Sequence, residues 1–314
     1  MGLAIGVDVG GTKVAAGLVD EQGTILARTR RPTPSTNPDD VEETIAAVVD
    51  ELRVGREVVG VGIGAAGFVD DERSRVLFAP NLTWRDEPLR DEVSARIGLP
   101  VVVENDANAM AWGEYRFGAG RGEQHLAAVT VGTGIGGGLV LDGRLYRGRF
   151  GVGAEFGHVM VVPDGRRCGC GQRGCWEQYC SGRALLHEAR EIADVQREYG
   201  ATLLALGRGR PEGIQAVDVT RAAQGGDPAA LDCFAEVGRW LGQGLADLAA
   251  LLDPGVFVIG GGVADAGELL LAPARVEFAR RLTAGPYRPH ARIRLAELGN
   301  EAGLVGAADL ARQP

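Results

Sequence analysis

Residues 7–23 read VDVGGTKVAAGLVDEQG, and residues 129–143 read VTVGTGIGGGLVLDG. Each stretch has an apolar strand, a glycine-rich turn, a second strand that ends in Leu-Val, and a turn with an acidic residue. Short Gly/Val stretches can match by chance. The same elements nevertheless recur in the same order far apart in the chain, and this pattern favours a duplicated domain.

Strand and helix patterns alternate around these two stretches. Apolar runs predict strands at residues 3–9, 13–20, 24–29, 58–64 and 101–104. Helical periodicity predicts helices at residues 39–53, 87–97, 107–117, 239–252 and 302–312. Such alternation is typical of a layered α/β domain.

A third glycine cluster, VFVIGGG at residues 256–262, lies between predicted helices. Glycine-rich turns after strands let backbone N–H groups approach phosphates, although glycine often serves only the turn itself. Three such turns in one α/β chain favour a nucleotide ligand. None matches a P-loop or a dinucleotide-binding GxGxxG in its proper context, which excludes those two kinds of site.

Composition narrows the class of protein. The chain has 314 residues and a formal net charge of −9, which argues against a nucleic-acid partner. Its start has no basic segment and no long apolar run, so we expect neither a signal peptide nor a membrane anchor, and a cytoplasmic location. Lys13 is the only lysine among 33 basic residues and lies in the first glycine-rich turn.

One loop collects three of the five cysteines. Cys168, Cys170 and Cys175 fall within eight positions, and His158 precedes them by ten. A Cys-x-Cys pair is a poor local disulfide because near neighbours rarely reach the required geometry. In a reducing compartment, three thiolates and one imidazole favour a closed tetrahedral zinc site over a redox role. We expect Cys180 and Cys233 to stay free as small buried side chains.

Five motifs in order resemble the ROK family of sugar kinases and repressors: DVGGTK, VENDANAMAWGE, TVGTGIGGG, GAEFGHV and CGCGQRGCWE. The resemblance runs over essentially the whole chain. It implies the duplicated actin-like ATPase fold, which is ribonuclease H-like, with two lobes around a central cleft. We expect residues 1–112 plus 300–314 to form a small lobe, and residues 113–299 to form a large lobe with the zinc loop.

The acceptor site is expected where the strand VVVE ends. Asn and Asp are favoured N-caps, so Asn105 or Asp106 could serve only to cap the next helix. The resemblance instead makes Asp106 the catalytic base, which accepts the proton of a sugar hydroxyl as the oxygen attacks the γ-phosphoryl group. It also implies that sugar hydroxyls contact a set of polar side chains and one glycine: Gly67, Asn105, Glu155, His158 and Glu177.

Two turns are expected to hold the triphosphate with backbone donors and hydroxyls. Asp8 would hold Mg²⁺ through water; its alternative role is that of a structural carboxylate at a strand end. For Lys13 the alternative is a solvated charge. The resemblance assigns the nucleotide to the following residues: Asp8, Gly10, Gly11, Thr12, Lys13, Gly132, Thr133, Gly134, Gly261 and Gly262.

The resemblance implies an enzyme that phosphorylates the 6-hydroxyl of D-glucose with ATP, as a homodimer or homotetramer. A sugar-responsive repressor is the alternative from another class, although such repressors carry an additional DNA-binding segment ahead of the first strand. The intact turns and the acidic charge favour the kinase. Fructose, mannose or N-acetylhexosamines as acceptor, and polyphosphate as donor, remain open at this point.

Overall fold

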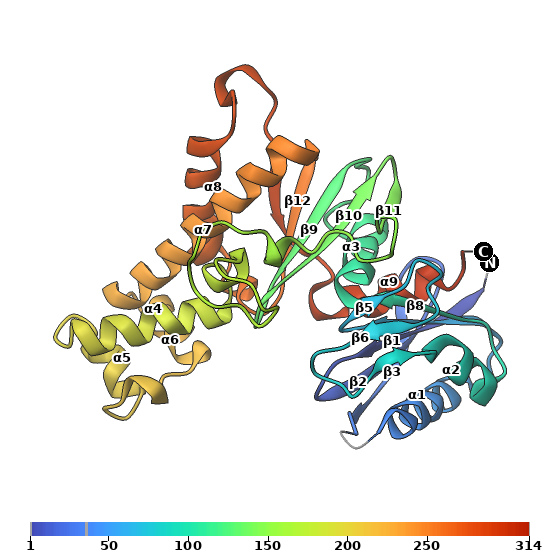
Figure 1. The fold of residues 1–314 in the computed structure, drawn as a ribbon. Helices are drawn as coiled ribbons and strands as arrows, with labels where there is room; N and C mark the ends of the chain where they lie inside the picture. Colours follow the sequence, from blue (N-terminus) through green and yellow to red (C-terminus); the bar gives the residue numbers. More distant parts are fainter. Residues whose placement is uncertain (1, 35–36, 314) are drawn as a thin grey trace. The chain divides into compact units, whose positions relative to one another are not determined.

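The computed structural model describes residues 2–34 and 37–313, and these form two compact units (Figure 1). The first unit takes in the chain up to Ala128, Gly137–Ala154 and the chain from Ala296 onward. The second takes in Val129–Gly136 and Glu155–Leu295.

The first sheet has the strand order β3-β2-β1-β4-β8. Its strands are β1 (Leu3–Val9), β2 (Lys13–Val19), β3 (Ile25–Pro32), β4 (Val58–Ala65) and β8 (Val101–Asn105). The first three strands pair antiparallel as consecutive hairpins, whereas β4 and β8 are parallel to β1. The strands predicted at residues 3–9, 13–20, 24–29, 58–64 and 101–104 are therefore confirmed, with β3 extending to Pro32.

The second sheet repeats this order as β11-β10-β9-β12-β13. Its strands are β9 (Leu126–Val131), β10 (Ile135–Leu141), β11 (Arg144–Tyr146), β12 (Val256–Gly260) and β13 (Arg292–Leu295). Here too, three strands that are consecutive in the chain lie next to two strands from later in the chain. These two later strands, β12 and β13, are parallel to each other. The recurrence confirms the predicted duplicated α/β fold.

Helices α1 (Pro38–Arg53) and α2 (Leu89–Ile97) pack beside one another in the first unit. Asn37 caps α1 by accepting the N–H of Asp40, and Pro38 occupies the first turn, where its missing N–H costs nothing. The predicted apolar positions form the buried face of the helix: Val41, Ile45, Val48, Val49 and Leu52. They complete a core with the strand side chains of the first sheet.

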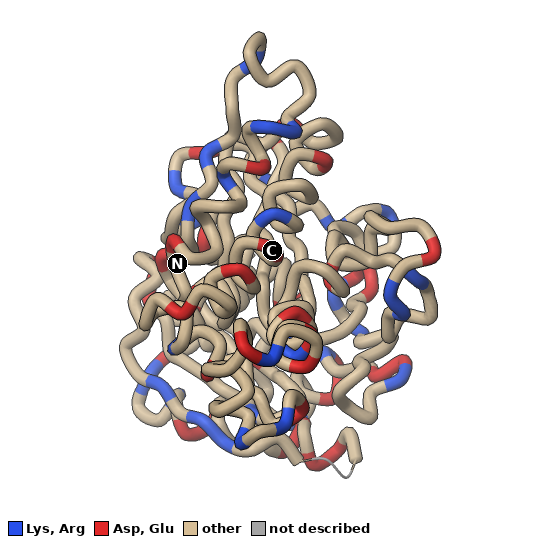
Figure 2. The backbone as a smooth tube through the Cα atoms, turned by 90° about the vertical axis from the view of Figure 1, so that its left-hand side faces the viewer, with Lys and Arg blue, Asp and Glu red and all other residues tan. Residues whose placement is uncertain are grey.

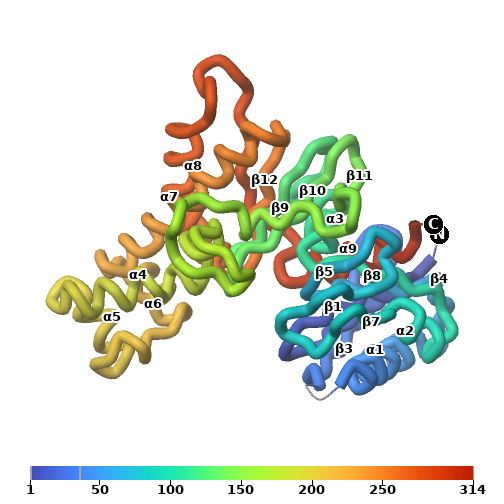
Figure 3. Tube along the Cα trace, in the orientation of Figure 1, coloured from blue at the N-terminus to red at the C-terminus, as the bar shows by residue number. Residues whose placement is uncertain are grey.

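Helix α9 (Ala302–Leu310) lies against α3 (Asp106–Phe117) and the first sheet, and its red trace meets green α3 in Figures 1 and 3. Glycines permit this close approach. A Cβ at Gly62 of β4 would lie 1.8 Å from the carbonyl oxygen of Ala307, and one at Gly306 would lie 1.8 Å from that of Ala109.

The compact units differ from the lobes expected from the sequence. The expected boundary at residue 112 falls inside α3, all of which belongs to the first unit because it packs against α9. The first unit also includes Gly137–Ala154, with most of β10 and all of β11. Helical packing, rather than the duplication, sets the boundary.

Several elements were not predicted. A small sheet consists of β5 (Phe68–Val69), β6 (Val76–Phe78) and β7 (Arg85–Glu87). In the second unit, α7 begins eleven residues before its predicted start. The helices of that unit are α4 (Gly182–Val195), α5 (Ala201–Leu206), α6 (Ala216–Gln224), α7 (Pro228–Leu252) and α8 (Glu268–Arg281). Short 3₁₀ turns include η1 (Phe156–His158), η2 (Trp176–Gln178), η3 (Pro211–Gly213), η4 (Ala264–Ala266), η5 (Gly285–Tyr287) and η6 (Gly299–Glu301).

Charged residues of both signs are interspersed along the backbone (Figure 2). This distribution accompanies the net charge of −9. The expectation that nucleic acid is not a partner stays a prediction. Among the described residues, none of the helices combines the length and the apolar character that a membrane crossing needs.

Candidate functional site

The acceptor corner lies in the first unit, where β8 ends at Asn105 and α3 begins at Asp106. Asn105 is the N-cap: its Oδ1 accepts the N–H groups of Ala107 and Asn108 at 2.9 and 3.0 Å. Its Nδ2 donates to the carbonyl oxygen of Gly67 at 3.0 Å. The structure thus joins two predicted sugar contacts, Gly67 and Asn105, by a hydrogen bond.

Asp106 is the first helical residue of α3 and not its cap, so the capping alternative applies to Asn105. Asp106 Oδ1 accepts the N–H of Ala107 at 2.9 Å. Gly64 of β4 packs close to Asp106: a Cβ atom at Gly64 would lie 3.8 Å from the Asp106 Cα atom. Asp8 of β1 is the cross-strand neighbour of Gly64. Asp8, near the end of β1, and Asp106, just after β8, therefore both lie at the carboxyl-terminal ends of parallel strands of the first sheet.

The first phosphate turn, Gly10 to Thr12, is closed by a bond from the Gly10 N–H to the Lys13 carbonyl oxygen at 3.0 Å. Burial raises the pKa of Asp8, and the charge of Lys13 opposes the rise. Asp8 and Lys13 both line a cavity of about 330 Å³. It is lined by Asp8, Lys13, Ala15, Ala16, Ile25, Arg28, Thr29, Arg30, Asn300, Glu301 and Leu304.

The other two glycine turns lie in the second unit. The Gly132 N–H donates to the Gly134 carbonyl oxygen at 2.9 Å, which closes the turn between β9 and β10. The Gly182 N–H at the start of α4 donates to the Gly132 carbonyl oxygen at 2.7 Å. After β12, the Ala264 N–H donates to the Gly261 carbonyl oxygen at 2.9 Å. The contacts of Gly261 and Gly262 with a nucleotide remain a prediction.

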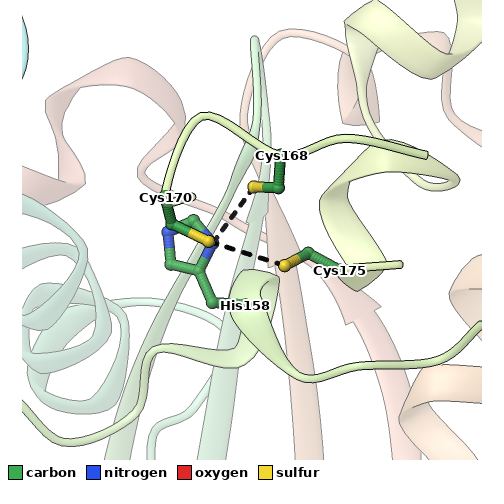
Figure 4. A group of neighbouring side chains, drawn as sticks. All are labelled: His158, Cys168, Cys170 and Cys175. Carbon is green, nitrogen blue, oxygen red and sulfur yellow. Dashed lines mark hydrogen bonds between the residues drawn. The ribbon is translucent and has the colours of Figure 1, made fainter. Parts of the chain in front are cut away.

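The four predicted zinc ligands come together in the second unit (Figure 4). Their ligand atoms all lie within 4.8 Å of one another. Cys168 Sγ lies 3.6 Å from His158 Nδ1, and Cys170 Sγ lies 3.7 Å from Cys175 Sγ. Zinc–sulfur bonds of about 2.3 Å in a tetrahedron imply sulfur–sulfur edges of about 3.8 Å. The donor set and its spacing therefore fit a metal ion.

Cys168, Cys170, Cys175, Cys180 and Cys233 are all free thiols, and Cys180 and Cys233 are fully buried. Backbone bonds fold the loop around the cluster: the Cys168 N–H donates to the Gln172 carbonyl oxygen at 2.9 Å. Burial raises the pKa of Cys233 to about 12, which keeps that thiol protonated and unreactive.

The predicted sugar carboxylates lie beside the cluster. Glu177 is 6% exposed, and its Oε1 contacts Cys168 Sγ and Gln178 Nε2, each at 3.1 Å. Burial raises the pKa of Glu155, the charge of His158 opposes the rise, and Glu177 adds to it. His158, Glu155 and Glu177 thus form one electrostatically linked group.

Arg183 was missed by the sequence interpretation. Its Nε donates to the Thr133 carbonyl oxygen at 3.1 Å, and its Nη2 lies 3.4 Å from Glu177 Oε1. Ser181 is a favoured N-cap, so the sequence could have placed Arg183 in the first turn of a helix, but its contacts with Thr133 and Glu177 depend on the fold. A Cβ at Gly134 would lie 2.2 Å from Glu177 Oε2, so the predicted sugar carboxylate directly adjoins the second phosphate turn.

Comparison with known proteins shows which family the whole chain resembles. The ROK family profile matches residues 4–314. The chain is 56% identical over 314 residues to a glucokinase from Streptomyces coelicolor, covering all of this chain and 99% of that one. It is 28% identical to the xylose repressor of Bacillus subtilis, covering 90% of this chain and 70% of the repressor.

A solved structure is also similar over its full length. It is a ROK family glucokinase from Streptomyces griseus in complex with glucose and AMPPNP, with 58% identity and a TM-score of 0.90. The alignment covers all of both chains.

Proposed function

Because this chain belongs to the ROK family, we propose that it is a glucokinase that transfers the γ-phosphoryl group of ATP to the 6-hydroxyl of D-glucose. The observation that carries the proposal is the similarity to a glucokinase crystallised with glucose and an ATP analogue. The acceptor corner and the closed glycine turns agree with it. The xylose repressor is more distant, at 28% identity.

Asp106 is the general base of this proposal. Its carboxylate accepts the proton of the glucose 6-hydroxyl as that oxygen attacks the γ-phosphorus. Asn105 orients the acceptor, because its amide is already fixed by Gly67 and by the first turn of α3. Because both side chains are held where β8 ends and α3 begins, they would position the acceptor oxygen before the phosphoryl group is transferred.

The nucleotide is bound by backbone donors of the two turns at Gly10–Thr12 and Gly132–Gly134. Asp8 would hold Mg²⁺ through water, and the ion would neutralise charge on the phosphates. Lys13 adds a cation beside Asp8. Gly261 and Gly262 would lie beside the ribose and the adenine of the nucleotide.

Zinc is proposed for the cluster of His158, Cys168, Cys170 and Cys175, as a structural ion. Bound zinc would fix the direction of the His158 ring and the position of Glu177. Glu155, His158 and Glu177 then bind sugar hydroxyls. We further propose a cytoplasmic location, since the clustered free thiols suit a reducing compartment. A homodimer or homotetramer is proposed from the family resemblance alone.

The test is an activity panel. Purified protein is assayed with ATP and with polyphosphate against glucose, mannose, fructose and N-acetylglucosamine, with product phosphate position read by NMR. We expect the largest kcat/KM for glucose with ATP, and phosphate on the 6-oxygen. A larger kcat/KM for another sugar would reassign the acceptor. If none of the sugars is phosphorylated, the proposal is wrong.

A further inference from the structure

Three charged side chains meet beneath the acceptor corner, all in the first unit. Glu104 of β8 is 1% exposed, and its Oε2 lies 3.4 Å from Arg73 Nε and 3.8 Å from Arg147 Nε. Arg73 stands in the turn between β5 and β6, and Arg147 directly follows β11. One buried carboxylate thus joins three segments that are far apart in the sequence.

The charges in this group do not balance. Two guanidinium groups face one carboxylate; burial lowers the pKa of Arg73, Glu104 opposes that change, and Arg147 adds to it. Several buried atoms also lack a hydrogen-bond partner among the described residues, namely Arg73 Nε and Nη2, Arg147 Nη1, Glu104 Oε2 and Asn108 Oδ1. Buried ion pairs with incomplete hydrogen bonding are a poor source of stability. A second arginine is therefore not explained by the fold alone.

The other oxygen of Glu104 holds the acceptor corner. Oε1 accepts the N–H of Asn105 and the Nδ2 group of Asn108, each at 3.0 Å. One bond fixes the peptide that precedes Asn105, and the other fixes the first turn of α3. The direction of this carboxylate therefore sets the orientation of the residue that caps α3, and with it the start of the helix at Asp106.

The two arginines bring their own segments to that carboxylate. The carbonyl oxygen of Arg73 accepts the N–H of Val103 in β8 at 3.1 Å, so its turn is fastened to the same strand. The carbonyl oxygen of Arg147 accepts the N–H of Gly153 at 2.8 Å, which closes the loop that leads along the chain to Glu155. Arg147 therefore links the loop before a predicted sugar contact to the acceptor corner.

We propose that Glu104 is a positioning residue for phosphoryl transfer. Its ion pairs with Arg73 and Arg147 fix the orientation of its carboxylate, and that carboxylate in turn holds Asn105 and Asp106 in the geometry that the acceptor requires. The proposal rests on the proposed function. It assigns Glu104 no contact with sugar or nucleotide. Misplacement of a reacting pair by about 1 Å can cost about 100-fold in rate. If the Glu104 carboxylate loses its fixed orientation, kcat should therefore fall more than KM for ATP changes.

Two variants test the orientation of the Glu104 carboxylate separately from the stability of the fold. Glu104→Gln keeps an acceptor oxygen for Asn105 and Asn108 but leaves two arginines uncompensated. Arg147→Met leaves the balanced Arg73–Glu104 pair and should preserve the melting temperature. We expect each to lower kcat by about 10- to 100-fold with KM for ATP within about twofold. In the double variant the losses should be less than multiplicative, because both act through one carboxylate.

Glu114→Gln is the matched control. Like Glu104, Glu114 is a buried carboxylate, but it lies near the C-terminal end of α3 and accepts the backbone N–H groups of Ala119, Glu297 and Leu298. It should lower the melting temperature with little change in kcat. If Glu104→Gln does not fold, Arg147→Met carries the test.

The outcomes separate the two proposals. An active wild type together with full kcat in Arg147→Met and in any folded Glu104→Gln overturns the positioning role. A wild type that transfers no phosphate to any sugar overturns the proposed function, and the positioning role falls with it.

Discussion

Glu177 Oε1 lies 3.1 Å from Cys168 Sγ, so a predicted sugar-binding carboxylate accepts a hydrogen bond from a predicted zinc ligand. This contact requires a protonated thiol. A metal-bound thiolate has no proton to donate, and its charge repels the carboxylate. The metal state of the cluster therefore acts directly on Glu177, whose Oε1 also accepts a hydrogen bond from Gln178 Nε2 at 3.1 Å.

Metal loss should consequently weaken sugar binding. We expect one zinc per chain in freshly purified protein, and we expect Cys175→Ala to lose the ion and to raise the Kd for glucose about tenfold or more. Cys233→Ala is the control, because Cys233 is a buried thiol of α7 outside the cluster. Elemental analysis and calorimetry measure both quantities. Unchanged glucose affinity in metal-free protein would contradict the link.

Asp106→Asn should separate catalysis from folding. The substitution removes the proton acceptor, and loss of a general base typically costs about 10²–10⁴ in rate. Because Asn105 provides the cap of α3, the melting temperature should change little. Steady-state kinetics should show a greatly reduced kcat with modest changes in ligand affinity. A variant that melts much earlier yet keeps most of its turnover would show that the base has been misassigned.

Asn105→Ala provides the complementary measurement. It removes the acceptor for two N–H groups of α3, and loss of such a cap typically costs about 1 kcal/mol. It also removes the bond to Gly67. We therefore expect lower stability and weaker glucose binding together, as measured by thermal unfolding and calorimetry. Lower stability with unchanged glucose affinity would limit Asn105 to a capping role.

The sequence interpretation succeeded where local signals coincide with the fold. The paired glycine turns predicted the duplication, and the apolar spacing of Val41, Ile45 and Val48 predicted the buried face of α1. The Cys and His spacing predicted the cluster because all four ligands lie close together in the chain.

Other features depend on distant contacts. Arg73, Glu104 and Arg147 are separated by long stretches of chain, and no periodicity brings them together. The strands β5 to β7 are two or three residues long, too short for an alternating pattern. The start of α7 was missed despite its Asp227 cap and Pro228, a pair that usually marks the beginning of a helix.

Glu42 should make stability depend on pH. Burial raises its pKa to about 7; Arg96 opposes the rise and Glu87 adds to it. The folded state thus holds a proton that the unfolded state releases near pH 4.5. Stability should fall as pH rises from about 4.5 to about 7, and then level off.

Glu42→Gln should flatten that profile and raise the free energy of unfolding above pH 7 by on the order of 1 kcal/mol. Arg96 keeps Glu92 and Asp39 as partners, each at 3.0 Å, so the substitution does not isolate its charge. Urea unfolding at pH 5 and pH 8 provides the comparison. An equal effect of the substitution at both values would show that Glu42 does not titrate in this range.

Two glycines of α9 should respond in opposite directions. Gly306→Ala places a Cβ 1.8 Å from the Ala109 carbonyl oxygen and should destabilise the first unit by about 1–3 kcal/mol or more. At Gly303 the nearest atom would be 3.7 Å away, and Ala is favoured over Gly in a helix by about 1 kcal/mol. Thermal unfolding should therefore rank Gly303→Ala above the parent and Gly306→Ala below it. Equal melting temperatures would refute the close packing of α9 on α3.

When VTVGT is aligned with VDVGG, Thr130 in β9 occupies the position that Asp8 occupies in β1, each in the strand before its glycine turn. The Thr130 hydroxyl accepts the N–H of Gly136 at 3.0 Å and so fastens its own hairpin. The two copies have specialised: one keeps an ionisable group at this position, and the other uses it for internal support. If Asp8 holds Mg²⁺ as proposed, the repeated backbone carries that ligand in its first copy, and the matching position of the second copy has a hydroxyl already engaged by Gly136.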